Sequence, residues 1–248
     1  MSRRPGEVLL EARAITKRFG GVAALDGCTL AVATGQVTGL IGPNGSGKTT
    51  LFNVLTGYLA ADAGQVVVEG RAVRRPSPQR LYALGIVRTF QYARLFPDLT
   101  PVEILALAAV KPFVAVLRPR VERADRDRAM GILERLGLLR IVGHRAGQLS
   151  YGQQRLLEFG TTLMAEPKLV LLDEPAAGVS PTMIAVIEDQ IRALRAEGVG
   201  FLLVEHQLDL VMRLCDSVVV MAAGCPVSSG TPEEVGKDPA VLEAYLGA

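Results

Sequence analysis

The sequence predicts an α/β fold built on a mostly parallel sheet. Short runs of Val, Ile and Leu alternate with longer helical patterns, for example at residues 169–172, 201–204 and 218–221. Strands that are apolar throughout are typical of parallel sheets covered by helices on both faces. With 248 residues, of which 49% are hydrophobic, the chain can bury such a core without disulfides or a structural metal.

The expected elements follow this alternation in order. A strand at residues 36–41 precedes a helix at 49–59, and residues 65–73 resemble a meandering strand pair, which suggests an antiparallel appendage. A capping-box pattern at residues 100–103 begins a helix, and the pattern stays almost wholly helical to about residue 149. The remaining elements are a helix at 181–197, a strand at 199–204, a helix at 207–214, a strand at 217–221 and a second capping box at Thr231.

Hydropathy, charge and cysteine content exclude several classes of protein. The mean hydropathy is +0.30, yet no run of about 18 apolar residues could span a membrane, and the richest stretch, 104–117, is broken by a lysine and a proline. The net charge of +2 lacks the basic excess expected of a nucleic-acid-binding protein. We find no secretion signal and expect a cytoplasmic protein. We expect neither a zinc site nor disulfides, but core or bystander thiols at Cys28, Cys215 and Cys225.

A phosphate-binding loop follows the first predicted parallel strand. Residues 42–49 match the pattern G-x-x-x-x-G-K-[ST] in full, and glycines there let consecutive backbone N–H groups turn toward a polyphosphate. Lys48 is expected to reach the β- and γ-phosphates, and the Thr49 hydroxyl to bind Mg²⁺. The alternative is an ordinary glycine turn before a helix. The expected nucleotide contacts are Gly42, Pro43, Asn44, Gly45, Ser46, Gly47, Lys48, Thr49 and Thr50.

Two acidic residues follow the apolar run at 169–172. Asp173 and Glu174 should therefore lie at the carboxyl end of a strand, where ligands bind in open α/β sheets. Asp173 suits the Mg²⁺ shell, and Glu174 is placed to orient or deprotonate an attacking water. Such a pair can also be a plain helix cap. The phosphate loop by itself fits kinases, GTPases, motors and transport ATPases, but no Asn-Lys-x-Asp guanine motif occurs, which disfavours a GTPase.

The segment Leu149-Ser150-Tyr151-Gly152-Gln153-Gln154 resembles the signature motif of ABC ATPases, with tyrosine at its third position. Ser150 is a suitable N-cap, and the helix after it points its positive end outward as an anion site. The resemblance implies a P-loop NTPase (RecA-like) core with an antiparallel β appendage and an inserted helical subdomain. It divides the single domain 1–248 into a core of 1–91 and 156–230, a helical subdomain of 92–155 and a C-terminal helical tail of 231–248.

The resemblance also implies the remaining site residues. Phe19 resembles the aromatic that stacks on adenine, although a phenylalanine near a strand end is more often a core residue. Gln91 resembles the glutamine that contacts Mg²⁺ and water, and His206 the histidine that contacts the γ-phosphate and holds the attacking water with Glu174. His144 is expected to be only a loop residue. The cofactors implied are ATP and Mg²⁺, and the signature residues implied to bind ATP across a dimer are Ser150, Gly152 and Gln153.

Several motifs resemble the ATP-binding subunits of branched-chain amino acid importers. They include residues 88–91, 94–96 and 173–178 and the closing segment 243–247. Related urea and amide importers share much of this pattern. The resemblance implies dimerisation with the same chain or a paralogue, two membrane permease subunits, an extracytoplasmic solute-binding protein and a peripheral place on the inner face of the membrane. The apolar stretch 92–117 is the expected docking site for the permeases.

The chain also departs from the ABC pattern. Residues 177–180 end in Ser180 where Asp or Asn is often found, which casts doubt on a cross-dimer carboxylate contact but leaves a good helix N-cap. Leu156 stands where many members carry arginine, and residues 160–162 replace an Ala-Arg-Ala-like stretch; we expect altered helix packing. The alternatives are a non-transport ABC ATPase, which usually has paired cassettes, coiled coils or basic arms, and a nucleotide-sensing module, which should lack Glu174 or His206.

Overall fold

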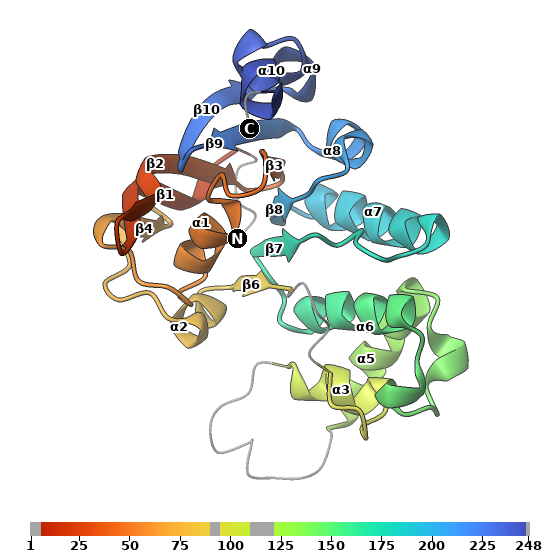
Figure 1. Ribbon diagram of the computed structural model, residues 1–248. Coiled ribbons are helices and arrows are strands. Elements are labelled where there is room, and N and C mark those ends of the chain that lie inside the picture. Colours follow the sequence, from red (N-terminus) through yellow and green to blue (C-terminus); the bar gives the residue numbers. More distant parts are fainter. Residues whose placement is uncertain (1–5, 90–94, 110–121, 247–248) are drawn as a thin grey trace.

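The computed structural model describes residues 6–89, 95–109 and 122–246. The chain forms two sheets with helices packed around them (Figure 1). One sheet has six strands in the order β10-β9-β3-β8-β7-β6, and the other has four in the order β2-β1-β4-β5. The predicted fold class, a mostly parallel sheet with an antiparallel appendage and helices, is therefore confirmed.

The six-stranded sheet carries the parallel strands. The five strands β9, β3, β8, β7 and β6 lie side by side in this order and run parallel. At the edge of the sheet, β10 pairs with β9 in the antiparallel direction. All residues of β3, β7 and β8 are buried, which explains why these strands are apolar throughout. The strands are β3 (Val37–Ile41), β6 (Ile86–Arg88), β7 (Leu169–Asp173), β8 (Gly200–Val204), β9 (Ser217–Ala222) and β10 (Cys225–Gly230).

The antiparallel appendage is larger than predicted. The predicted pair is present as β4 (Ala63–Val68) and β5 (Arg71–Ala72), but β4 also pairs with β1 (Val8–Phe19), which pairs with β2 (Val22–Ala33). The two long strands escaped prediction because their pairing shifts register at several points, and Ala14 takes a positive φ of 48°. These irregularities interrupt the two-residue alternation by which a strand is recognised.

The helices that follow Thr100, Ser150, Ser180 and Thr231 begin where their capping patterns predict, whereas the short helix after Ser77 was not predicted. The side chains of Ser77, Thr100, Ser150, Ser180 and Thr231 each accept a hydrogen bond at the start of a helix. The helices are α1 (Lys48–Leu55), α2 (Pro78–Ala83), α3 (Pro101–Leu107), α5 (Arg123–Arg135), α6 (Tyr151–Met164), α7 (Pro181–Ala196), α8 (Leu208–Leu214), α9 (Pro232–Gly236) and α10 (Pro239–Leu246).

Two helical predictions were too long. Helix α1 ends at Leu55 rather than Leu59, because Gly57 has a φ of +72° and breaks the helical path. The stretch from α5 to α6 is not continuous α-helix: Gly137 has a φ of +68°, and two short 3₁₀ turns follow, η1 (Leu139–Ile141) and η2 (Ala146–Gln148). Helices α3, α5 and α6 pack on one another and lie together at the bottom of Figure 1.

The six-stranded sheet separates two hydrophobic cores. Neighbouring residues of one strand point to opposite sides, so that Leu171 joins the core shared with α1 and the antiparallel sheet, while Leu172 joins the core shared with α6, α7 and α8. Leu202 and Leu203 divide in the same way. No helix among the described residues is long and apolar enough to cross a membrane.

Candidate functional site

Three adjacent parallel strands end at the same edge of the sheet, and each is followed by a predicted site segment. The phosphate loop follows β3, Asp173 and Glu174 end or follow β7, and His206 comes after β8. Strand β8 lies between β3 and β7 in the sheet, so the three segments meet although the sequence separates them widely (Figure 1). This is the edge at which open α/β sheets bind ligands.

Glycine is required for the path of the phosphate loop. Gly42, Gly45 and Gly47 have φ angles of 145°, 79° and 102°. A Cβ at Gly42 would overlap the Met221 carbonyl oxygen, and one at Gly47 would lie 2.5 Å from the Ala24 carbonyl oxygen. Only glycine fits both the backbone conformation and the space at these two positions.

The lysine of the loop is folded back on the loop itself. The Lys48 Nζ donates to the carbonyl oxygens of Gly42, at 2.7 Å, and Pro43, at 2.9 Å. Burial lowers the pKa of Lys48, and the nearby Glu174 carboxylate opposes that shift. The lysine therefore already lies in the loop that a polyphosphate would occupy.

The loop contains polar groups that suit a phosphate ligand. The Ser46 hydroxyl is buried and has no hydrogen-bond partner among the described residues. Asn44, Gly45 and Thr49 lie at the exposed rim of the loop. A buried hydroxyl without a partner is unusual in proteins, and a ligand oxygen would satisfy it. Together with the glycine-lined path, this group fits a bound polyphosphate, and the oxygens of Thr49 and Asp173 are of the type that Mg²⁺ prefers.

Asp173 is held by an arginine to which the sequence analysis assigned no role. The Arg88 guanidinium lies 3.3 Å from the Asp173 carboxylate and also donates to Asn53 at 2.8 Å and Thr56 at 2.9 Å. It lies near the rings of Phe52 and Tyr58, with centroids at 4.7 and 5.0 Å. Burial raises the pKa of Asp173, and Arg88 opposes this rise. In the sequence, Arg88 was marked only by its place in the segment 88–91, one of the motifs that resemble importer ATPase subunits.

Glu174 and His206 face each other as the resemblance implies. The His206 Nε2 lies 3.2 Å from Glu174 Oε1, and both side chains are partly accessible to solvent. The Glu174 backbone N–H donates to the Val204 carbonyl oxygen at 2.9 Å, which ties the ends of β7 and β8 together. Because the carboxylate and the imidazole are side by side and partly accessible, one water molecule next to the pair could contact both groups.

A buried glutamate, also missed by sequence reasoning, fixes the backbone on both sides of this pair. The Glu205 carboxylate accepts hydrogen bonds from the backbone N–H groups of Ala176, at 2.9 Å, and His206, at 3.0 Å. It is 3% exposed. Its only sequence signal was its place immediately before His206.

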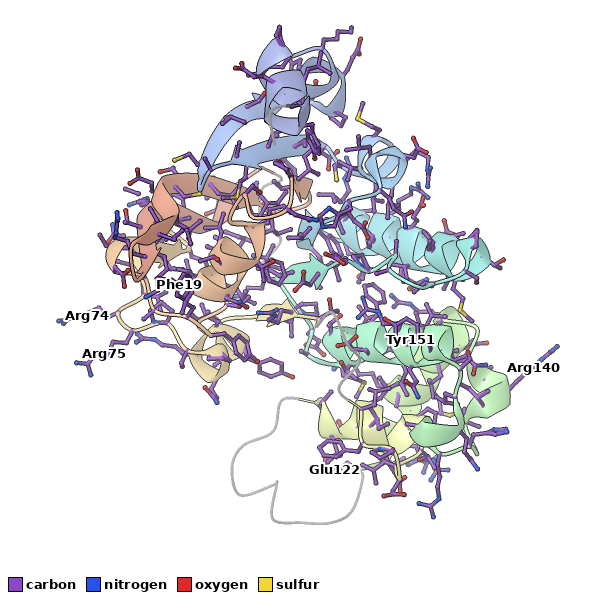
Figure 2. The ribbon with its side chains drawn as sticks, viewed as in Figure 1. Phe19, Arg74, Arg75, Glu122, Arg140 and Tyr151 are labelled. Carbon is purple, nitrogen blue, oxygen red and sulfur yellow. The ribbon has the colours of Figure 1, made fainter. Side chains whose placement is uncertain are left out.

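The signature segment forms a capped helix start. Ser150 accepts from the Gln153 N–H at 3.3 Å, and the Gln153 side chain accepts from the Ser150 N–H at 2.9 Å. A Cβ at Gly152 would overlap the Met183 sulfur, so the glycine permits close packing on α7. The exposed Tyr151 ring lies beside Gly178 (Figure 2). Helix α6 packs mainly on α3, α5 and α7 rather than on the phosphate loop of its own chain.

Phe19 lies near the phosphate loop rather than in a core. Its ring is 52% exposed at the end of β1 (Figure 2) and, with Thr49, Thr50 and Arg88, lines a hollow of about 360 Å³. An exposed aromatic at the edge of such a hollow is available for stacking.

Of the other predicted site residues, Gln91 lies outside the described residues, and His144 is exposed between η1 and η2. All three cysteines are free. Burial raises the pKa of Cys28 and that of Cys215 to about 12, so these thiols stay protonated. In the described ranges, no group of three or more His, Cys, Asp or Glu side chains could hold a metal ion by itself.

The C-terminal helix reaches the phosphate loop. Burial raises the pKa of Tyr245 on α10, and the nearby Gly42 backbone N–H opposes this rise. The Gly224 N–H also donates to the Ser46 carbonyl oxygen at 3.0 Å. Residues from the end of the chain therefore support the loop, and the only sequence signal for Tyr245 was the closing segment 243–247.

Comparison with known proteins agrees with this arrangement. Residues 25–177 match the family model of the ABC transporter, and residues 226–248 match that of the branched-chain amino acid ATP-binding cassette transporter. The chain is 40% identical to a probable branched-chain amino acid transport ATP-binding protein LivG of Methanocaldococcus jannaschii, covering 96% of this chain and 97% of the relative. It is also 40% identical to a high-affinity branched-chain amino acid transport ATP-binding protein BraF of Pseudomonas aeruginosa, covering 96% and 98%.

Solved structures give the same result. The crystal structure of an ADP conformation of an ATP-binding cassette of an ABC transporter superposes with a TM-score of 0.85 at 38% identity, covering 97% of this chain and 99% of the other. The family model matches more than half of the chain, and relatives at this identity extend over nearly all of it. The chain therefore belongs to the ABC transporter family of ATP-binding cassettes, whose members bind nucleotide and couple ATP hydrolysis to transport.

Proposed function

We propose that this chain hydrolyses ATP·Mg²⁺ as the ATPase subunit of an importer for branched-chain or other amino acids. It acts as one domain, 1–248, that pairs head-to-tail with a second ATPase subunit. The observation that carries the catalytic assignment is the 3.2 Å contact of Glu174 with His206, at the sheet edge that also carries the phosphate loop. Its relatives named as branched-chain amino acid transport proteins support the class of solute.

The residues of the site divide the work of phosphoryl transfer. Lys48 and the N–H groups of the loop bind the phosphates, and Thr49, Asp173 and Gln91 would hold the Mg²⁺, which neutralises phosphate charge. Glu174 orients and polarises the attacking water, and His206 keeps that water and the γ-phosphate in place.

The second subunit completes the site. Ser150, Gly152 and Gln153 stand at the start of α6, and the positive end of that helix suits the γ-phosphate bound by the other subunit. One chain thus contributes a phosphate loop to one nucleotide and a signature segment to another. Because each bound ATP would contact both subunits, ATP binding would bring the two subunits of the dimer together.

Docking on permease subunits at the inner face of the membrane would couple this closure to transport. The described part of the expected docking stretch leaves Phe96 62% exposed and Leu107 63% exposed. Exposed apolar side chains of this size suit a protein partner. Purification of the tagged chain from membranes should recover two permease subunits and an ATPase partner, together with a solute-binding protein encoded for the same system. Recovery only with ribosomes or DNA would contradict the transport assignment.

The catalytic assignment is tested with Glu174→Gln. Loss of the carboxylate should lower the turnover number by about 10²- to 10⁴-fold, as for other general bases, while ATP still binds. Glu233→Gln is the matched control, because the Glu233 side chain is 80% exposed and pairs with Lys237 on the surface, away from the phosphate loop. Near-normal ATP turnover of Glu174→Gln in the assembled transporter would overturn the role of Glu174.

A further inference from the structure

The backbone of Glu174 has a conformation that a glutamate rarely adopts. Its φ is +46°, in the left-handed region that favours glycine. The residue stands between the end of β7 and a turn, and its carbonyl oxygen accepts the Ala177 N–H at 3.1 Å. Such a conformation persists only where surrounding contacts hold it, so the direction of the carboxylate depends on those contacts.

One of these contacts is a buried arginine on α6. The Arg155 Nη2 donates to the Glu174 carbonyl oxygen at 2.8 Å and to the Asp173 carbonyl oxygen at 3.4 Å. The Arg155 Nη1 forms an ion pair with Glu158 at 3.0 Å. Arg155 is 4% exposed and Glu158 is 6% exposed. The rigid, permanently charged fork of the guanidinium therefore places Nη2 against two consecutive carbonyl oxygens and Nη1 against Glu158.

We propose that Arg155 is a positioning residue for hydrolysis, which holds Glu174 in its left-handed conformation and so directs the carboxylate toward His206. The proposal rests on the proposed role of Glu174 as the group that polarises water. Arg155 does not touch the nucleotide; it acts through the main chain of Glu174. It also lies on the helix that begins with Ser150, so it connects the signature segment to the turn that carries Glu174.

This role differs from that of a buried ion pair which only stabilises the fold. An arginine that only stabilised the fold through an ion pair would need no contact beyond Glu158. Arg155 also donates hydrogen bonds to the two carbonyl oxygens at the site. The two roles make different predictions, because loss of a structural contact lowers stability without selectively lowering turnover.

The first experiment separates turnover from binding. In the assembled transporter, Arg155→Met should lower the turnover number for ATP about 100-fold, because an error of about 1 Å in the place of a catalytic group has an effect of this size. Arg155→Lys keeps the charge but loses the fork, and should lower turnover about 10-fold. The dissociation constant for ATP·Mg²⁺ should change by less than about twofold in both variants.

The control is Arg128→Met. Arg128 also donates to a main-chain carbonyl oxygen of α6, that of Leu163 at 3.0 Å, and pairs with Glu166, but at the other end of the helix. Its turnover should stay within about twofold of the unaltered chain. Equal losses of turnover in Arg155→Lys and Arg128→Met, or a loss of ATP affinity as large as the loss of turnover, would overturn the proposal.

A second measurement does not depend on activity. Glycine adopts a left-handed conformation without strain, so in Glu174→Gly no backbone strain is left to be released when Arg155 is lost. In the unaltered chain, release of the strain at Glu174 should offset part of the hydrogen bonding lost in Arg155→Lys, so the shift in the urea midpoint should be larger in the Glu174→Gly background than in the unaltered chain. An equal shift in both backgrounds would refute the proposal. Normal turnover of Glu174→Gln would instead refute the proposed function and leave this stability comparison standing.

Discussion

Replacing Arg88 with methionine tests whether this arginine compensates the buried charge of Asp173. The Arg88 and Asp173 side chains are 10% and 12% exposed, and their charged groups lie 3.3 Å apart. Methionine keeps an unbranched apolar side chain near Phe52 and Tyr58 but removes the charge and every hydrogen bond of the guanidinium. The ionised Asp173 would then be buried without its cation.

The expected loss of stability follows from this geometry. Removing one partner of a buried ion pair costs about 3–5 kcal/mol, and the remaining exposure of both side chains places this pair near the lower end. At about 2–4 °C per kcal/mol for a chain of this length, the melting temperature should fall by about 6–12 °C. Arg80→Met is the control, because Arg80 is exposed and donates to the Arg74 carbonyl oxygen, so its loss should stay within about 0.5 kcal/mol.

The loss at Arg88 should also depend on pH. Burial already raises the pKa of Asp173 above 3.8, and removing Arg88 lets it rise further. Because the pKa of Asp173 is higher in the folded than in the unfolded state, ionisation of Asp173 destabilises the fold at neutral pH. This destabilisation disappears as the pH falls through the folded-state pKa toward 3.8. Urea unfolding should therefore show a smaller difference between Arg88→Met and the unaltered chain at about pH 5 than at pH 7. A difference that stays constant or grows on acidification would refute the reasoning.

Three further substitutions probe separate parts of the site. Phe19→Ala should weaken ATP binding, measured by calorimetry, by about 5- to 100-fold because stacking is lost, whereas Phe19→Tyr should keep the affinity. An affinity of Phe19→Ala equal to that of the unaltered chain would contradict the stacking role. Gly42→Ala should abolish ATP binding, because the new methyl group would overlap the Met221 carbonyl oxygen, whereas Gly131→Ala on α5 has open space and should bind ATP normally. Ser180→Ala removes the N-cap of α7 and should lower the free energy of unfolding in urea by about 1 kcal/mol, and unchanged stability would show that the cap contributes nothing.

Residues that lie at strand ends could be predicted from the sequence, because a parallel sheet brings the ends of its strands to one edge. The phosphate loop, Asp173 and His206 each follow an apolar run that is short and fully buried in the structure. The strand-end pattern placed Asp173 and Glu174, while the loop was recognised by its motif and His206 by the resemblance to ABC ATPases. The long strands β1 and β2 lacked such a signal, since their register shifts hide the alternation.

The residues that hold the site in place were not predictable in the same way. Arg88 contacts Asp173, Arg155 contacts the Glu174 carbonyl oxygen and Glu205 contacts the Ala176 N–H, and no spacing in the sequence indicates these three contacts. A charged residue in a helix or loop is most often a solvated one, so its burial becomes visible only when the fold brings two segments together.

Arg155 and Glu205 share one feature that explains their place in the molecule. Glu205 accepts backbone N–H groups on both sides of the Glu174 and His206 contact, while Arg155 donates to the carbonyl oxygens of Asp173 and Glu174. Each therefore contacts the main chain at or next to a predicted catalytic group and not the side chain of that group. The parallel sheet brings the phosphate loop, Glu174 and His206 to one edge. Arg155 and Glu205 then fix the backbone conformation at that edge and thereby the directions of the Glu174 and His206 side chains.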